Sequence, residues 1–174
     1  MTLFKPIRYQ PPPNKAVRAS VVSWSDAKLP VYAIRQEVFV EEQHLTHSVV
    51  DEPDDTISVH VLASIESEVV GIGRVTFIGD DGQVAWVAVR HGMRRHGVGL
   101  EIMRRLITVC VDEGCSVVSL NAQTHALSFY ERLGFRPLGR RFRMSGIEHQ
   151  HMLMDLDESD DLPTDRDSGN RRSY

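Results

Sequence analysis

The sequence predicts an α/β fold, in which a mixed and mostly antiparallel sheet carries helices on both faces. Three observations support this class. Residues 58–78 alternate apolar and polar side chains as a β-hairpin does, and residues 97–113 carry a wide apolar face at helical spacing. Residues 116–121 form a β-branched run that is typical of a strand buried on both faces. Strands and helices in this succession predict one layered domain.

The first half of the expected domain supplies most of the antiparallel strands. Val31, Ile34 and Val38 recur at helical spacing and predict the first helix, and Pro53 punctuates an acidic loop. The expected elements are a strand at 16–23, a helix at 29–43, the loop at 51–56, a hairpin of strands 58–65 and 69–78, a turn at 79–82 and a strand at 84–89.

The second half alternates helices and strands. Gly114 and Gly134 each follow a run with helical character, as glycines that end helices do. The expected elements are a helix at 97–113, a strand at 116–121, a helix at 124–133 and two closing strands at 136–145 and 149–156. No internal repeat interrupts this order.

The two ends of the chain are expected to lie outside the domain, which spans residues 16–156. Residues 1–15 contain three consecutive prolines, which force an extended backbone, so we expect a flexible arm there. Residues 157–174 are polar and acidic and can bury too little apolar surface to fold, so we expect a disordered acidic tail.

The bulk composition excludes several classes of protein. The 174 residues carry a net charge of −4 and a pI of about 6.0, which argues against nucleic acid as the main partner. No run approaches the ~20 apolar residues of a membrane span, and the N-terminus lacks the apolar core of a secretory signal. Cys110 and Cys115 have no metal-type partners nearby and are expected to be free thiols in a reducing cytoplasm.

An anion site is expected where the strand at 84–89 runs into the helix at 97–113. Gly97 and Gly99 stand at the helix start, where unpaired backbone N–H groups and the helix dipole favour a phosphate. Arg94 and Arg95 lie in the turn itself, and we assign them a phosphate role. Arg104 and Arg105 further along the helix are interpreted as part of a solvated face.

The two halves of this pattern together resemble the GNAT superfamily of acyl-CoA-dependent N-acetyltransferases over residues 16–156. One family motif corresponds to the segment from Arg94 to Gly99, RRHGVG, between a strand and a helix. The second corresponds to Phe129-Tyr130 followed by Gly134-Phe135, with Gln123 where the family has asparagine. Residues 35–43 and 146–152 are similar to the ElaA-like subgroup. The resemblance implies a GNAT-type sheet.

The resemblance also implies acetyl-CoA as co-substrate. In such enzymes, the pyrophosphate rests on the N–H groups of the glycine turn, and the pantetheine arm adds to the sheet as a pseudo-strand. The residues that it assigns to acetyl-CoA are Val87, Ala88, Val89, Arg94, Arg95, His96, Gly97, Val98, Gly99, Gln123 and Phe129. A dinucleotide or nucleoside triphosphate site is disfavoured because its glycine and lysine motifs are absent.

Three residues are candidates for the chemistry. Tyr130 is expected to protonate the CoA thiolate, although a tyrosine in the core is the alternative. Glu42, with Glu37 beside it, is the leading candidate for the base, because residues 37–55 hold seven acids and no Lys or Arg and could wall the pocket of a cationic amine. For residues 51–55, a solvated loop is equally compatible. His149 is a second possible base.

The expected activity is therefore direct transfer of an acetyl group from acetyl-CoA to a primary amine of a small molecule. The alternative is an acyl-CoA-binding regulator that turns over weakly. His149 and His151 have the i, i+2 spacing of metal ligands, but without a third clustered ligand we expect no metal. The acceptor stays open among amino sugars, polyamines, aminoglycosides, amino acids and protein termini, and a homodimer is possible.

Overall fold

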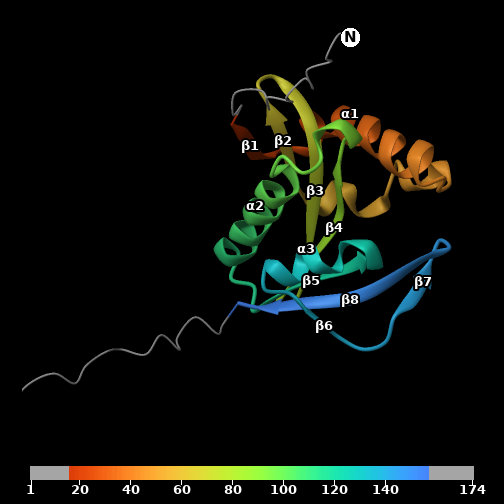
Figure 1. Ribbon diagram of the computed structural model, residues 1–174. Helices are drawn as coiled ribbons and strands as arrows, with labels where there is room; N and C mark the ends of the chain where they lie inside the picture. The colour runs from red at the N-terminus through yellow and green to blue at the C-terminus, as the bar shows by residue number, and fades with distance from the viewer. Residues whose placement is uncertain (1–15, 157–174) are drawn as a thin grey trace, which may run out of the picture.

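A computed structural model describes residues 16–156, and the two expected tails, 1–15 and 157–174, lie outside the described residues. The strands are β1 Val17–Val22, β2 Val59–Ile65, β3 Glu68–Ile78, β4 Asp81–Val89, β5 Val117–Gln123, β6 Arg136–Pro137, β7 Phe142–Met144 and β8 Ile147–Asp155. They form one sheet in the order β1-β2-β3-β4-β5-β8-β6, with β7 paired to β8 (Figure 1). Every pairing is antiparallel except that between β4 and β5.

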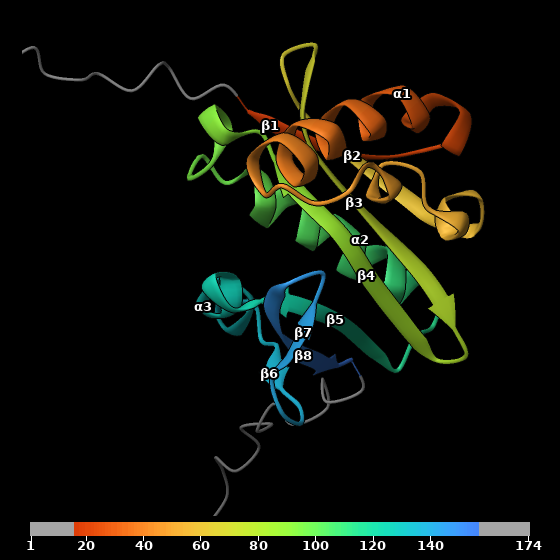
Figure 2. The same ribbon diagram turned by 90° about the vertical axis from the view of Figure 1, so that its right-hand side faces the viewer.

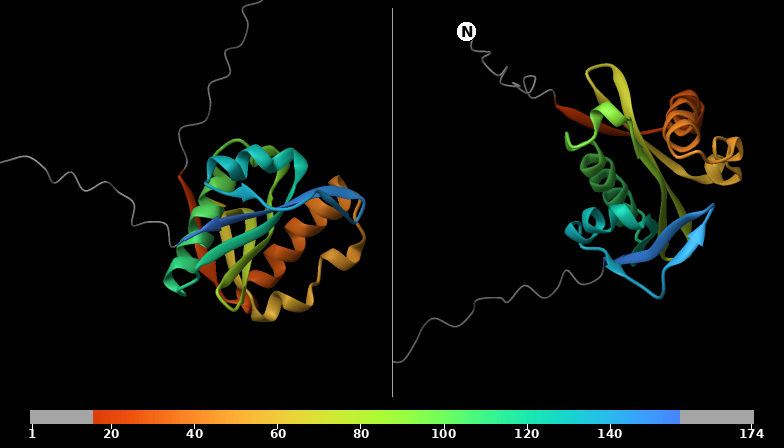
Figure 3. Two further views of the ribbon diagram at one scale, coloured as in Figure 1. Left: turned by 90° about the horizontal axis from the view of Figure 1, so that it is seen from below. Right: turned by 45° about the vertical axis from the view of Figure 1, so that its right-hand side comes forward.

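Helices cover both faces of this sheet, so the predicted fold class is confirmed (Figures 2 and 3). The α-helices are α1 Trp24–Arg35, α2 Val98–Asp112 and α3 Leu127–Arg132, and a π-helix, η1 Gln36–Glu42, continues α1. Short 3₁₀ turns are η2 His47–Val49, η3 Pro53–Ile57, η4 His91–Met93 and η5 Thr124–Ala126. One apolar cluster packs α1 and η1 on the sheet, and a second packs α2 and α3 on its other face.

The first helix begins five residues earlier than its predicted start. Ser23 caps it, since its hydroxyl accepts from the backbone N–H of Asp26 at 3.4 Å, and Pro30 lies inside it. The predicted closing strand at 136–145 is also two short strands rather than one. Gly139, at φ +71°, lies between them, and a left-handed residue interrupts extended backbone.

Two glycines of β3 let α2 pack close to the sheet. A Cβ on Gly71 would lie 2.8 Å from the side chains of Ile102 and Val98, and one on Gly73 would lie 2.7 Å from Ile102. Ile102 is completely buried, so it has little room to withdraw. The position of α2, and therefore of its N-terminus, depends on these two missing side chains.

Replacement of Gly73 by alanine should therefore destabilise the domain by about 1–3 kcal/mol, because the added methyl group overpacks the interface with Ile102. Urea unfolding monitored by circular dichroism measures the change. Gly92→Ala is the control, because nothing lies within 4 Å of its added Cβ and it should stay within about 0.5 kcal/mol of the wild type. Equal midpoints for both variants would contradict the close packing.

The sheet opens between its two parallel strands. β4 and β5 pair only from Asp81 with Val117 to Val84 with Leu120, and beyond Val84 the strands have no paired residues. The second half of β4 therefore presents unpaired backbone groups toward the opening. Such groups are ready to bind an extended ligand in the manner of an added strand.

An irregularity in β4 fixes which side chains face this opening. The register with β3 shifts between Ile72 and Arg74, and Trp86 has a positive φ of 55°. As a result, Trp86 packs with the α1 cluster, whereas Val87 packs with the α2 cluster. A bulge of this kind re-aims a strand beside a site.

Candidate active site

A cleft of about 1300 Å³ runs along the α2 face of the sheet, beside the opening between β4 and β5. Its wall includes Val87 and Val89 of β4, the turn before α2, the first half of α2, and η5 with α3. Many of the residues that the sequence assigned to acetyl-CoA meet here: the cleft is lined by Val87, Val89, Arg94, Arg95, Gly97, Val98, Gly99 and Phe129.

The turn before α2 has the geometry of an anion cradle. Gly97 adopts the left-handed conformation at φ +79° as the N-cap of α2, and no side chain caps the helix start. Arg95 is also left-handed, at φ +63°, which exposes its side chain beside the cleft. The side chain of Val98 is buried in the core, so only its backbone N–H is available to a ligand. Bare N–H groups at the start of a 15-residue helix favour a phosphate.

Arg94 braces this turn rather than reaching into the cleft as a free cation. Its guanidinium donates two hydrogen bonds to Glu42, at 2.6 and 2.8 Å, and a third to the Val89 carbonyl at 3.0 Å. His96 contacts the Arg94 carbonyl through Nδ1 at 2.7 Å. Arg94 therefore ties the turn to the end of β4 and to the end of η1.

The same ion pair bears on Glu42 as the expected base. Hydrogen bonds from Arg94 lower the pKa of the Glu42 carboxyl, and its charge also interacts favourably with His91. A carboxylate stabilised in its charged form is a weaker proton acceptor. The neighbouring candidate, Glu37, lies 3.6 Å from the Arg90 guanidinium. Both carboxylates are therefore engaged by arginines.

Phe129 and Tyr130 close the cleft on the side of α3. A Cβ on Gly99 would lie 3.5 Å from the Phe129 ring, which shows how closely α3 approaches the start of α2. The Tyr130 ring packs edge-on against Phe129 and Phe135, with ring centroids at 5.0 and 5.9 Å. Burial raises the pKa of Tyr130 to about 12, and no group among residues 16–156 hydrogen-bonds its hydroxyl. The phenol is thus protonated and available.

Two residues of the predicted set lie away from the cleft. Ala88 is buried in the α1 cluster, because it alternates with Val87 and Val89 along β4. The Gln123 amide exchanges two hydrogen bonds with Gln43, at 2.9 and 3.3 Å, and so joins β5 to the segment after η1 across the opening. Its side chain is therefore occupied by the protein itself.

Sequence reasoning missed three basic side chains of the cleft. Arg104, which was interpreted as part of a solvated face, lines the cleft and also pairs with Glu101 at 2.9 Å. His125 and Arg132 line it as well. The signal was available, since these two lie four residues before and three residues after Phe129 and so share its face of a helix.

His149 lies on the opposite face of the sheet, with its ring orientation fixed. It pairs with Gln123 in the β5–β8 ladder, is 5% exposed and stacks on Phe142 at 5.9 Å. Its Nδ1 lies 2.8 Å from the Ile147 carbonyl. Since a carbonyl only accepts, Nδ1 carries the proton and Nε2 keeps a lone pair.

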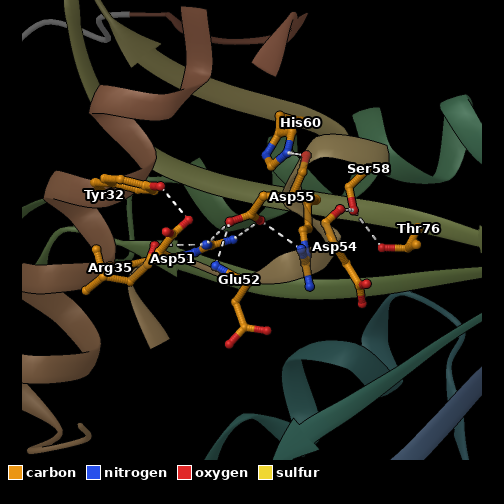
Figure 4. A network of polar contacts seen from close by, with 11 residues as sticks. Tyr32, Arg35, Asp51, Glu52, Asp54, Asp55, Ser58, His60 and Thr76 are labelled. Carbon is orange, nitrogen blue, oxygen red and sulfur yellow. Dashed lines mark hydrogen bonds and ion pairs between the residues drawn. The ribbon is translucent and has the colours of Figure 1, made fainter. Parts of the chain in front are cut away.

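A buried ion cluster anchors η3 to the sheet beside the opening (Figure 4). The Asp55 carboxylate accepts hydrogen bonds from Arg35 at 2.6 and 2.8 Å and from Arg74 at 2.7 Å, and all three side chains are at most 5% exposed. Arg35 also lies 5.1 Å from the Trp86 ring, and His60 contacts the Asp55 carbonyl at 2.8 Å. Part of the expected acidic wall is therefore a fully paired structural element.

Within residues 16–156, no three His, Cys, Asp or Glu side chains gather closely enough to hold a metal ion. None of the helices in that range is long and apolar enough to cross a membrane. Cys110 and Cys115 are both buried and free, and burial raises the pKa of Cys110 to about 12.

Comparison with known proteins agrees with this geometry. The family described as the Acetyltransferase (GNAT) domain matches residues 20–156. The chain belongs to the GNAT acetyltransferase family. Among curated relatives, the uncharacterized N-acetyltransferase YjcF of Bacillus subtilis is 35% identical over 126 residues, which cover 71% of this chain and 89% of the relative. This chain is therefore an N-acetyltransferase.

The ElaA-like assignment within the GNAT family is also confirmed. ElaA of Escherichia coli is 29% identical over 128 residues, which are 71% of this chain and 84% of ElaA. The crystal structure of E. coli ElaA aligns with a TM-score of 0.71 at 25% identity, over 80% of this chain and all of ElaA. A B. subtilis acetyltransferase solved in complex with CoA shares the fold, with a TM-score of 0.64 at 16% identity over 81% of this chain and 99% of that one.

Proposed function

We propose that this GNAT enzyme transfers an acetyl group from acetyl-CoA directly to a primary amine of a small molecule. The observation that carries the proposal is the continuous path from the glycine turn, past Val89 and Val87, to the Tyr130 hydroxyl. The N–H groups of the turn would hold the pyrophosphate, and the unpaired edge of β4 would hold the pantetheine arm. Arg104, His125 and Arg132 add positive charge along the same cleft.

In the proposed reaction the amine nitrogen attacks the thioester carbon, so a C–N bond forms and the C–S bond breaks. An ammonium ion must first lose a proton, since its pKa is near ~10. His149 is the proposed acceptor of that proton because Nε2 keeps its lone pair. Tyr130 is the proposed donor to the departing thiolate. A backbone N–H near Val87, beside the bulge, is proposed to stabilise the oxyanion.

This arrangement gives Glu42 a different part from the expected one. Its carboxylate holds Arg94, and Arg94 holds the Val89 carbonyl, so we propose that Glu42 positions the cofactor turn. The buried free thiols Cys110 and Cys115 support a location in a reducing cytoplasm. A homodimer stays a prediction.

The first test asks whether acetyl-CoA binds at the glycine turn. At a hundredfold excess over Kd, acetyl-CoA should raise Tm by roughly 5–11 °C through mass action. Gly97→Trp should abolish this shift, because the indole would fill the open space in front of the helix N-terminus. Differential scanning fluorimetry measures both effects.

Gly114→Trp is the matched control for this test. Gly114 also has a left-handed backbone, at φ +76°, with nothing within 4 Å of an added Cβ, but it lies beyond the far end of α2. It therefore carries the same backbone strain and the same bulk, and should keep the shift. Protection that survives in Gly97→Trp would place the cofactor elsewhere. Tight binding of acetyl-CoA with no CoA release in any amine mixture would favour the acyl-CoA-binding regulator.

A further inference from the structure

The face of the sheet that carries α1 has a row of polar residues beside the opening. Arg74 pairs with Ala85 across β3 and β4, and Asn121 pairs with His151 across β5 and β8. Because Val84 pairs with Leu120 in the parallel ladder, Ala85 and Asn121 stand at the same level, where the two strands begin to part. We call Arg74, Ala85, Asn121 and His151 the polar row.

The residues of the polar row face away from the cofactor cleft. Leu120 and Ala122 pack in the α2 cluster, so Asn121 between them points to the opposite face, toward α1. His151 contacts Asn121 at 2.8 Å between Nδ1 and Oδ1, which fixes the imidazole beside the strand opening. Substrate approaching from this face would meet the thioester through the gap between β4 and β5.

Glu52 lies beside the polar row on the side of β3. Its backbone N–H donates to Asp55 at 3.2 Å, and Asp55 is held in turn by Arg74 of the polar row. In Figure 4 the Glu52 side chain points away from the buried ion cluster. Among residues 16–156 it forms no ion pair, whereas Asp55 is fully paired. A rigid backbone thus presents one uncompensated carboxylate.

The charges around Glu52 leave a negative excess. Two cations, Arg35 from α1 and Arg74 from β3, and two other acids, Asp54 and Asp55 from η3, act on its carboxyl. Asp51, which precedes it, accepts a hydrogen bond from Tyr32. Burial raises the pKa of Glu52, which is half-buried, but not enough to remove its charge at neutral pH. Two arginines therefore face four carboxylates, and a cationic ligand would restore the balance.

We propose that Glu52 selects acceptors that carry a second cationic group besides the amine that is acetylated. The inference rests on the proposed acetyl transfer. Val87 and His149 mark the level of the reaction, and the polar row lies two residues deeper along the strands. Two residues of a strand span about 6.6 Å. An alkyl chain of four carbons between two amines has a comparable length, so the acceptor class is a short diamine or polyamine.

Three probes that share one carbon skeleton test this specificity: 1,4-diaminobutane, 1-aminobutane and 4-aminobutanoate. Release of CoA thiol gives kcat/KM for each. The wild type should prefer the diamine over the monoamine by at least tenfold and should use the amino acid least. In Glu52→Gln that preference should fall to within about threefold, mainly through the KM of the diamine, because uniform binding is lost. Asp54→Asn, which removes an exposed charge two residues away, should keep the preference.

Calorimetry of 1,4-diaminobutane binding to the CoA-loaded protein adds a measurement that needs no turnover. The wild type should bind the diamine at least tenfold more tightly than Glu52→Gln does. Equal affinities, an unchanged diamine preference in Glu52→Gln, or no turnover of any probe while acetyl-CoA still raises Tm would overturn the proposal. Absence of the acetyl-CoA shift itself would instead count against the proposed function.

Discussion

Replacement of Asp55 by asparagine should cost this domain about 3–5 kcal/mol of unfolding free energy. The reason is the pair of buried guanidinium groups, Arg35 and Arg74, which share this single carboxylate at distances of 2.6–2.8 Å. The neutral amide would leave two charges with almost no exposure to water and without a counterion. Removal of one member of a buried ion cluster is far more damaging than loss of a surface pair.

Urea unfolding at pH 7 measures this loss. The control is Asp54→Asn, which removes the neighbouring, exposed carboxylate and should change the free energy by less than about 0.5 kcal/mol. A loss below 1 kcal/mol in Asp55→Asn would mean that water or another group compensates the two arginines.

The same cluster gives the wild type an acid-sensitive stability. Burial alone would raise the pKa of Asp55, but hydrogen bonds and charge from Arg35 lower it below the ordinary value of 3.8. The unfolded chain therefore binds a proton first. The stabilisation is complete above the ordinary pKa and is lost as the pH falls through the lower pKa of the folded protein. Asp55→Asn should lack this loss between pH 4 and its acid limit.

Tyr130→Phe should lower kcat by tenfold or more, equivalent to about 1.4 kcal/mol or more, with little change in the affinity for acetyl-CoA. The phenol lines the cleft, is protonated at neutral pH and has no hydrogen-bond partner among the described residues, so its one free function is donation to a ligand. The ring itself packs with Phe129 and Phe135 and is preserved by the substitution.

Steady-state kinetics with 1,4-diaminobutane or the best amine found, and calorimetry with acetyl-CoA, separate the two effects. Tyr32→Phe is the control, because it also removes one phenolic hydroxyl, which donates to Asp51 on the other face of the sheet. Its kcat should change by much less than tenfold. An unchanged kcat in Tyr130→Phe would remove the tyrosine from the proton path and leave it a packing role.

Much of the fold could be predicted because the signals are local. Alternation at 58–78, the apolar face of α2 and the two ending glycines each depend on a few consecutive residues, and each element formed where it was expected. The start of α1 was placed five residues too late because its signal, the Ser23 cap, lies outside the apolar pattern. The bulge at Trp86 has no such local signal, since it depends on pairing with β3.

The candidate site divides in the same way. The glycine turn and Phe129-Tyr130 were predicted as cofactor residues, and both line the cleft. The partners of the acids could not be predicted, because the segment from Glu37 to Asp55 contains no cation. Its counterions arrive from β3 and from the turn before α2, 19 and 52 residues away along the chain.

The sequence by itself determined the class of the sheet, the family and the place of the anion cradle, because helix starts, apolar periodicity and turn residues act over a few positions. Only the tertiary structure decided which charges are already neutralised. Long-range pairing assigned Glu42 to Arg94 and Asp55 to two arginines, and left Glu52 without an ion pair among the described residues. Coulombic partners are set by distance in space, and distance in space is what the order of residues does not state.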